Sequence, residues 1–588
     1  MVFWAVVSLA FVAWGLVRLS IDRTPTADAG RSNLETLMPW WVASAMSWTA
    51  LTAMGWMLWR GLAPARREAQ PHAALIVLVV AVAARLVVLM GHAPCLSDDV
   101  FRYVLDGRNL AFGFNPYLDT PADRAEFRST REGGLVERPL GVVQGDAALP
   151  PHLEERWPGE ADVLSLVNNP ELHTISLPAA QWVFALAGLL VREDGSDALT
   201  SAWVMRSVMT GFEIVAIVLL LAALSFRGRP AWWAALYAWH PLALSEIAGS
   251  GHQDAIGLML MMLAYIAFTV APSGTRGRGR VWAWTIALAL AALVKPVVLP
   301  LAVFMLRDGS LMKRNQGGTE ARRENRKQKT ESGKQKAETG EPNDSTPPST
   351  ISHEPSTSPL RASVPPWFIL RACWRNWKAW AASLTIGAAV CAAVAGPLWL
   401  SHGGQPLRNV LATSARFTTK WAHFGSVYEP TLWAIRLVDP LEDPVAQWEK
   451  KERHEALARL VCVAALLLVC AGAFFFAADA WRAGRIILFA MVLCSTTAHP
   501  WYLLWALMLA PLAMSPALWI ASLTIPLAYA QFGDVEGWTT PVWAMWLAYA
   551  PVYAALAVHA ATQVIGNWSG GDRQQRHQAP RARMARSS

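Results

Sequence analysis

Two adjacent carboxylates begin the segment of this sequence with the strongest chemical signal. Asp98 and Asp99 are followed by Arg102, Tyr103 and Asp106. In a helix, Asp98, Arg102 and Asp106 are spaced four residues apart and share one face. A carboxylate placed beside a hydroxyl group can act as its general base. The same acids also suit the first turn of a helix, where the helix dipole favours negative charge, so spacing alone leaves both interpretations open.

Cationic side chains near this pair suggest phosphate binding. Arg102 and Arg108 carry guanidinium groups, which hold phosphate oxygens in a bidentate manner. A surface ladder of Asp98, Arg102 and Asp106 explains Arg102 equally well. Far along the chain, Lys295 stands before Pro296 between two short apolar segments. A lysine at such a break is costly, which makes it a candidate for function, with snorkelling to the interface as the alternative.

Two polar turns provide further candidates. Glu246, His252 and Asp254 flank a glycine-rich turn, and His499 precedes Pro500 in a second turn. His252 and Asp254 alone do not predict a zinc site, which takes more ligands. The sequence therefore predicts no definite cofactor and leaves a need for a divalent metal open. The alternative interpretation of both turns is polar capping between helices.

The elements that must position these residues are apolar runs. Hydrophobic residues make up 54% of the chain and charged residues 16%, against roughly a quarter charged in ordinary soluble domains. Runs of about 18 or more apolar residues recur, and each is long enough to cross a bilayer as a helix. These runs predict an all-α polytopic membrane protein with about 12–14 transmembrane helices. The candidate spans are 2–18, 38–59, 73–92, 203–225, 231–248, 253–271, 281–294, 297–307, 379–400, 456–478, 484–497, 500–514, 516–532 and 541–563.

Two polar stretches divide the chain into modules. A first outer loop at 93–202 carries the acidic pair on an amphipathic juxtamembrane helix, which we expect Gly113 and Asn115-Pro116 to end. A linker at 308–375 is rich in Lys, Glu, Ser, Thr and Pro, which predicts disorder. The predicted modules are two extra N-terminal spans (1–72), a catalytic module (73–307), the linker, a C-terminal transmembrane module (376–564) and a basic tail (565–588).

Lysine and arginine predict the orientation, because they are enriched in cytoplasmic loops. They gather at 60–72, 227–229, 276–280, 308–375 and 565–588. All these segments fall on one side if 281–307 forms a hairpin of two short helices. The sequence then predicts a multi-pass protein of the inner (cytoplasmic) membrane, with both termini cytoplasmic and the outer loop on the other face. Because the net charge of +8 lies in loops and tails, it does not indicate a nucleic-acid partner.

The order of these motifs resembles the bacterial integral-membrane glycosyltransferases of the GT-C superfamily. The likeness is closest to the polyprenyl-phosphate-mannose-dependent α-mannosyltransferases and covers roughly residues 73–305. Departures occur at Leu105, where the family often has Trp, and at Ser176-Leu177, which replaces a Tyr-Pro. The matching motifs are the 98–108 segment with Asn115-Pro116-Tyr117, Asn168-Asn169-Pro170, Trp239-His240-Pro241-Leu242, Gly251-His252-Gln253-Asp254, Lys295-Pro296 and Pro500-Trp501-Tyr502.

The resemblance implies an inverting transfer of a hexose, and of mannose in particular. The donor would be a polyprenyl-phosphate sugar and the acceptor a glycan or lipid, with membrane lipids around the protein. Asp98 or Asp99 would be the base, and Arg102, Lys295 and Arg108 would contact the donor phosphate. Further substrate-site candidates are Tyr103, Asp106, Glu246, His252, Asp254 and His499.

Two other function classes compete with this interpretation. A transporter or flippase of lipid-linked or small polar substrates is typically built from two symmetric halves with paired broken helices. The sequence shows one clear break, at Lys295-Pro296, and no evident internal repeat. A receptor or scaffold would need only to bind through the outer loop. The motif order favours the transferase.

Overall fold

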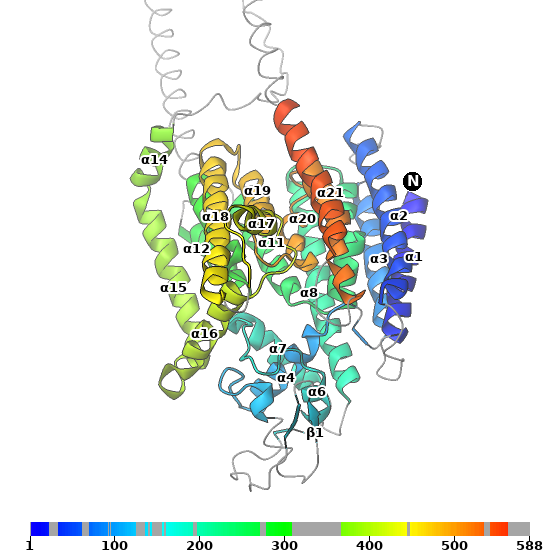
Figure 1. Ribbon diagram of the computed structural model, residues 1–588. Coiled ribbons are helices and arrows are strands. Elements are labelled where there is room, and N and C mark those ends of the chain that lie inside the picture. Colours follow the sequence, from blue (N-terminus) through cyan, green and yellow to red (C-terminus); the bar gives the residue numbers. More distant parts are fainter. Residues whose placement is uncertain are drawn as a thin grey trace, which may run out of the picture.

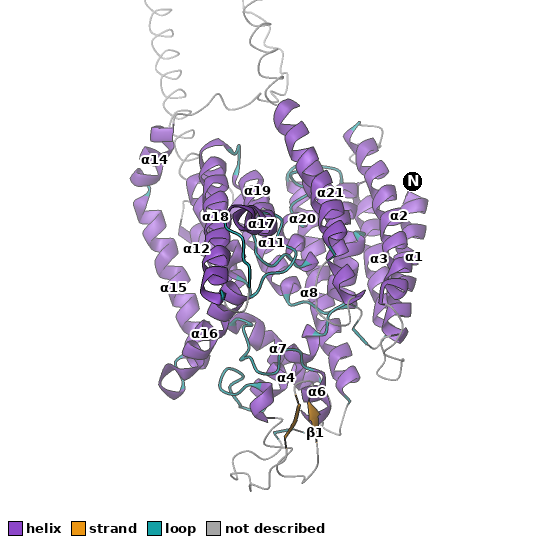
Figure 2. Cartoon of the chain, in the orientation of Figure 1, coloured by secondary structure: helices purple, strands orange, loops and turns teal. Residues whose placement is uncertain are grey.

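The computed structural model describes most of the chain and is built almost entirely of helices (Figures 1 and 2). One short antiparallel hairpin, β1 (Val136–Arg138) and β2 (Gly141–Val143), pairs Val136 with Val143. The described residues are 2–22, 33–60, 70–91, 93–94, 96–124, 136–138, 141–143, 156–157, 160–191, 197–270, 278–308, 366–443, 447–533 and 541–562. Residues 309–365 of the predicted linker and the predicted basic tail lie outside the described residues. The last part of the predicted linker, 366–375, is the helix α14, which the composition of the linker did not indicate.

The first half of the chain contains the helices before, within and after the outer loop. They are α1 (Val2–Asp22), α2 (Asn33–Trp59), α3 (Gln70–Leu89), α4 (Asp99–Ala111), α6 (Glu160–Leu166), α7 (Pro178–Leu190), α8 (Ala198–Phe226), η3 (Ala231–Ala234), α9 (Ala235–Ala238), α10 (Pro241–Ala243), η4 (Leu244–Gly249), α11 (Asp254–Val270), α12 (Arg278–Ala292), η5 (Pro296–Val298) and a helix at 299–308.

The second half adds a further set. It comprises α14 (Pro366–Arg375), α15 (Trp377–Trp399), η6 (His402–Gly404), α16 (Gln405–Lys420), α17 (Tyr428–Val438), α18 (Trp448–Phe476), α19 (Ala480–Leu493), η7 (Pro500–Leu503), α20 (Leu504–Leu507), α21 (Pro516–Thr524), η8 (Ile525–Gly533) and a C-terminal helix (Val542–Thr562).

The predicted class, an α-helical membrane protein, is supported by helix length and composition. Among the described residues, five helices are long and apolar enough to cross a membrane: Pro71–Leu89, Ala198–Phe226, Trp377–Trp399, Trp448–Phe476 and Val542–Thr562. Several of the other predicted spans correspond to shorter or interrupted helices. The predicted span 231–248, for example, is divided into η3, α9, α10 and η4. Pro241 starts α10 because proline lacks an N–H and is favoured at the first helical position.

The helix bundle has two distinct ends. In Figure 1, α4, α6 and α7 gather at the lower end of the bundle, and α14 lies at the upper end. At the end away from α4, the guanidinium of Arg229 donates to the carbonyl of Pro511 at 3.0 Å. Arg227 lies over the Tyr265 ring, which in turn lies 3.6 Å from the ring of Trp481. The basic turn after α8 is therefore far along the bundle from the acidic pair.

The segment 281–307 turns back on itself as expected. Lys295, between α12 and η5, contacts Asp254 at the start of α11. The helix at 299–308 then returns to the opposite end, where Asp308 accepts a hydrogen bond from the backbone N–H of Ala480 at 2.6 Å and Arg307 donates to the carbonyl of Phe474 at 2.7 Å. Lys295 is thus the apex of a hairpin that reaches toward α4.

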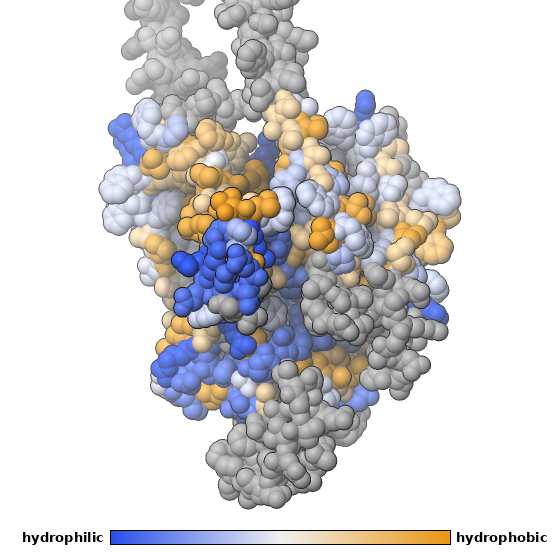
Figure 3. Space-filling view, in the orientation of Figure 1, coloured by the Kyte–Doolittle hydropathy of each residue, from blue (hydrophilic) through white to orange (hydrophobic). Residues whose placement is uncertain are grey.

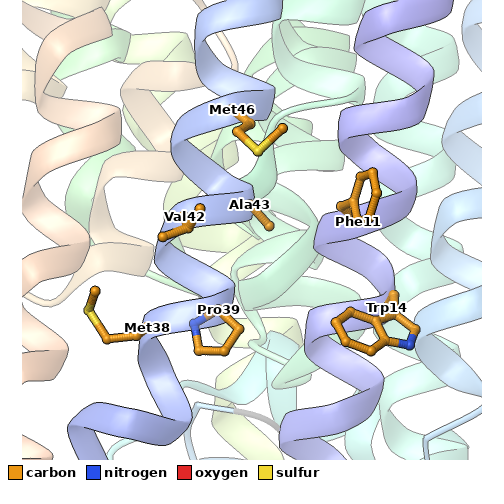
Figure 4. Close-up of a pocket in the computed structure, with 7 residues that line it drawn as sticks. All are labelled: Phe11, Trp14, Met38, Pro39, Val42, Ala43 and Met46. Carbon is orange, nitrogen blue, oxygen red and sulfur yellow. The ribbon is translucent and has the colours of Figure 1, made fainter.

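Polar and apolar surfaces separate along the bundle. On the face seen in Figure 3, hydrophilic residues are frequent toward the end that holds α4, and hydrophobic residues are frequent on the helices beyond it. A shallow groove between α1 and α2 belongs to the apolar surface (Figure 4). Since its lining has no titratable side chain, it is not a candidate for chemistry. The lining residues are Phe11, Trp14, Met38, Pro39, Val42, Ala43 and Met46.

Helix α4 is fixed by a backbone-close crossing with α7. A Cβ at Gly107 would lie 2.3 Å from the carbonyl oxygen of Phe184, and one at Gly188 would lie 3.0 Å from the backbone of Gly107. Tyr103 stacks on Phe184 with ring centroids 4.6 Å apart. Only glycine allows the two helices to approach so closely. This crossing holds the middle and the second half of α4 against α7.

The predicted helix is present as α4, but its polar face is buried, whereas we expected it to be exposed. The helix begins at Asp99 and ends before Gly113, which has φ +86°. An interfacial helix would leave its polar face in water. Here Asp106, Arg108 and Asn109 are buried together with the apolar residues, because α6 and α7 cover that side of α4.

Candidate functional site

The acidic pair is held by one amide. Asn168 donates from Nδ2 to Oδ1 of Asp98 and to Oδ1 of Asp99, at 2.9 Å in both cases. Asp98 occupies the N-cap position of α4, yet its side chain makes no capping hydrogen bond. Asp98 is exposed and the Asp99 side chain is 31% exposed. The two carboxylates therefore converge on Asn168 at the surface, where an external hydroxyl group can reach them.

A buried histidine lies behind Asp99. His252 Nδ1 is 3.8 Å from Asp99 Oδ2, and its Nε2 is 3.3 Å from Glu246 Oε2. The side chains of His252 and Glu246 have no solvent exposure. Glu246 lies on the π-helical turn η4 and accepts a hydrogen bond from the Tyr529 hydroxyl at 2.7 Å. Such turns are frequent at functional sites because they displace a side chain from regular helical register.

The turn that carries His252 requires glycine. Gly251 has φ +81°, and a Cβ there would lie 2.8 Å from Cγ of Arg206. Arg206 is itself buried and donates to the carbonyls of Gly91 and Ala248, each at 2.8 Å. This arginine therefore connects the chain between α3 and α4 to the end of η4. The connection holds the His252 turn close to the start of α4.

An aromatic stack fixes the ring of His252. The ring lies on Trp501 with centroids 4.1 Å apart and an interplanar angle of 20°. The other side of the stack is His499, 4.2 Å from Trp501 at 5°. His423 lies a further 5.7 Å from His499, between centroids. His499, predicted as a candidate from its turn, is thus connected to the acidic pair through Trp501 and His252.

Lysine and a second carboxylate form the other half of the site. Lys295 Nζ donates to Asp254 Oδ1 at 2.8 Å and lies 4.3 Å from the centroid of the Tyr502 ring. The lysine side chain is 19% exposed, and Asp254 is 1% exposed. Asp254 also accepts a hydrogen bond from the Trp505 indole. Trp505 can approach because residue 257 is glycine, where a Cβ would clash with the indole ring.

Tyr103 connects the two halves. Burial raises the pKa of its phenol, and the nearby carboxylates of Asp99 and Asp254 raise this pKa further. The turn at His252–Asp254 joins the two halves in space, because His252 lies 3.8 Å from Asp99 and Asp254, two residues later, binds Lys295. The Tyr502 ring lies beneath the lysine, 4.3 Å from its ammonium group.

The structure gathers most of the predicted site residues and leaves three engaged elsewhere. Arg102 donates to the carbonyls of Asn169 and Leu172, the shorter bond being 2.7 Å. Asp106 accepts from Gln181 at 2.8 Å, and burial raises the pKa of its carboxyl. Arg108 lies 4.5 Å from the ring of Trp157. The predicted residues brought together are Asp98, Asp99, Tyr103, Glu246, His252, Asp254, Lys295 and His499.

Several residues of the site carried no assigned role in the sequence. Asn168 lies 69 positions from Asp99, and Trp505 lies 251 positions from Asp254. Tyr529 and His423 stand in segments without a chemical motif. The one available signal was the Asn168-Asn169-Pro170 turn, whose side-chain amides are natural donors to carboxylates.

The donor set is suited to acid–base and phosphate chemistry. Within the part of the chain that the structure describes, no group of three or more His, Cys, Asp or Glu side chains is arranged to hold a metal ion. The chain matches no family model, no curated protein and no solved structure. What the site offers is a pair of accessible carboxylates and a partly exposed lysine, which the turn from His252 to Asp254 connects.

Proposed function

We propose that the chain is an integral-membrane glycosyltransferase that moves a hexose from a polyprenyl-phosphate donor to a hydroxyl group of a glycan or lipid. The observation that carries the proposal is that one turn joins Asp99 and Lys295 at one end of an apolar helix bundle: His252 lies 3.8 Å from Asp99, and Asp254, two residues later, binds Lys295. These groups come from segments far apart in the sequence. A base for the acceptor and a cation for the leaving phosphate are the two groups that this reaction needs.

The proposed reaction assigns a step to each of these groups. The acceptor oxygen attacks C1 of the sugar, and the bond between C1 and the phosphate oxygen breaks. The polyprenyl phosphate leaves with the bonding electron pair, and C1 inverts. The acceptor proton passes to the carboxylate of Asp98 or Asp99, both of which are accessible. Lys295 stabilises the charge that develops on the phosphate.

The sequence suggested that Arg102 and Arg108 contact the donor phosphate, but in this proposal they have a structural role. Their guanidinium groups contact backbone carbonyls and Trp157. We assign them to holding the outer loop in place. Lys295 remains as the phosphate contact, because its ammonium group lies at the apex of its hairpin and is partly exposed.

The proposal places the site on the outer face of the inner membrane, with both chain termini in the cytoplasm. It is supported by the separation of charges along the bundle, because Arg229 and Arg307 lie at the end away from Lys295. Basic residues are enriched on the cytoplasmic side. A donor whose polyprenyl chain lies in the bilayer can then present its phosphate at the outer boundary. Mannose is the sugar that the sequence resemblance favours.

Direct transfer tests the proposal. Purified protein in lipid nanodiscs would receive synthetic polyprenyl-phosphate mannose or polyprenyl-phosphate glucose, with a membrane extract as the source of acceptor. We expect a glycosylated product from one donor, with the opposite anomeric configuration, and loss of the product in Asp98→Asn or Asp99→Asn. No product from either donor would contradict the proposal and favour transport of a lipid-linked substrate, which a flipping assay in proteoliposomes would then measure.

A further inference from the structure

His252 occupies an unusual position between two carboxylates. Its Nδ1 faces Asp99 Oδ2 at 3.8 Å, and its Nε2 faces Glu246 Oε2 at 3.3 Å. Neither nitrogen makes a hydrogen bond of good geometry within the described residues, and neither does Glu246 Oε2. Hydrogen bonds at reaction sites are often long before substrate binds and shorten in the complex. The arrangement is therefore a line of three titratable groups that leads from the buried Glu246 to the accessible Asp99.

Glu246 needs a positive neighbour. Its side chain is completely buried, and the hydrogen bond from Tyr529 satisfies only Oε1. An isolated buried carboxylate is strongly unfavourable unless a cation or hydrogen-bond donors compensate it. The basic group closest to Oε2 in the described structure is His252. A proton on Nε2 satisfies this oxygen, and a second proton on Nδ1 then points at Asp99.

The surroundings of His252 favour a fixed, charged ring. Its face lies on the indole of Trp501, and a cation over an indole face is favourable. Its backbone N–H donates to the carbonyl of Glu246 at 3.1 Å, which closes the turn. Other groups with charge or a titratable proton also face this line. They are the phenols of Tyr103, Tyr502 and Tyr529, the Lys295–Asp254 pair, Asp98 across Asn168, Arg102, Arg206 behind the turn, and His499 beyond Trp501.

We propose that His252 carries a proton on both ring nitrogens and is a positioning residue for Asp99, with Glu246 as its buried counter-charge. The cation keeps Asp99 ionised and holds its carboxylate toward the acceptor hydroxyl. The catalytic part of this proposal rests on the proposed transferase activity, whereas the charge state of His252 does not. Removing the cation allows Asp99 to accept a proton at higher pH, so the acid limb of the pH profile of kcat/KM moves to higher pH.

The activity measurement compares His252→Gln and Glu246→Gln with the control His559→Gln, which changes an exposed histidine of the C-terminal helix. We expect both site variants to lower kcat by about tenfold to a hundredfold, with little change in KM for the donor, and to move the acid limb upward. His559→Gln leaves the profile unchanged. If both site variants lowered kcat/KM at its plateau but left the acid limb of the pH profile in place, the positioning role would be overturned. Loss of a merely structural residue lowers the rate without moving the acid limb.

A second measurement does not depend on turnover. Protein labelled with ¹⁵N-histidine reports by NMR whether each imidazole is neutral or doubly protonated, and loss of a resonance in His252→Gln assigns the signal. We expect a doubly protonated His252 at pH 7 in the wild type and a neutral ring in Glu246→Gln. A neutral His252 in the wild type would overturn the proposal whether or not transfer is seen. A doubly protonated ring in a protein that transfers no sugar would reject the proposed function alone.

Discussion

Two charged clusters in this molecule differ in burial and in how completely their hydrogen-bonding groups are satisfied. In the first, between α3 and α8, Arg85 and Glu213 form two hydrogen bonds of 2.7 Å, and both side chains have no solvent exposure. Arg85 also donates to the carbonyl of Ala238 at 2.8 Å. In the second cluster, around Asp99 and Lys295, both of these side chains are partly exposed. The nitrogens of His252 in the second cluster have no hydrogen bond of good geometry within the described residues.

This difference suggests a structural role for the first cluster and a role in substrate binding for the second. A buried ion pair whose hydrogen-bonding groups are all engaged fixes the packing of two helices and has no capacity for a substrate. A cluster that has unsatisfied hydrogen-bonding groups and is open to the surface can bind a substrate. Both clusters place charged side chains in an apolar helix bundle, where such charges are by default functional candidates. Burial alone therefore does not distinguish the proposed site from a structural ion pair, so we base the distinction on the state of the hydrogen bonds.

The largest loss of stability is expected from breaking the Arg85–Glu213 ion pair. Glu213→Gln leaves the buried guanidinium of Arg85 without its counter-charge, which costs about 3–5 kcal/mol of stability. Thermal unfolding in detergent, read by intrinsic fluorescence, should show a much lower Tm and little folded protein. Arg85→Met combined with Glu213→Gln removes both charges and should recover much of the loss. A Glu213→Gln protein with normal Tm and no transfer would place this pair in the site and break the comparison.

The next largest effect, a loss of activity, is expected at Lys295 in the cluster around Asp99 and Lys295, which we call the open cluster. Lys295→Met removes the group assigned to the leaving phosphate and should lower kcat by about a hundredfold. The change also leaves Asp254 buried without its lysine. Adding Asp254→Asn restores the charge balance. We expect it to restore Tm but not kcat, as measured by transfer assay and thermal unfolding on the same samples. Recovery of kcat in the double variant would show that Lys295 only neutralises Asp254.

A smaller effect is expected at the crossing that positions the acidic pair. Gly107→Ala places a Cβ against the backbone of Phe184, which forces α4 and α7 apart and costs about 1–3 kcal/mol. Chemical unfolding curves should show the loss. The matched control is Gly387→Ala in α15, where a Cβ meets nothing within 4 Å. Equal stability of the two variants would mean that α4 is not held by this crossing.

The smallest effect is expected at the amide that joins the two acids. Asn168→Ala removes a hydrogen bond to each carboxylate and should lower kcat/KM by about tenfold, the equivalent of about 1.4 kcal/mol. Ser165→Ala, a nearby exposed change, serves as the control and should leave kcat/KM unaltered. If Asn168→Ala transfers sugar at the wild-type rate, the amide does not orient the base.

Much of this arrangement followed from sequence, and the limits have physical causes. The α-helical membrane class, the helix that begins at Asp99 and the turn back at Lys295 are local consequences of apolar runs, a glycine and a proline. The burial of the polar face of α4 depends on Phe184 and Gly188 in α7, which no local pattern encodes. Trp505, Tyr529 and Asn168 belong to the site through contacts that only the fold creates.

The most direct test of the central claim, that the open cluster performs sugar transfer, pairs activity with stability in Asp99→Asn. The transfer rate from the active donor and the Tm would be measured on the same purified samples of wild type, Asp98→Asn and Asp99→Asn. We predict a loss of about a hundredfold to ten-thousandfold in rate for one of the two variants, at unchanged Tm. Wild-type rates in both variants, or a loss that occurs only together with unfolding, would contradict the claim.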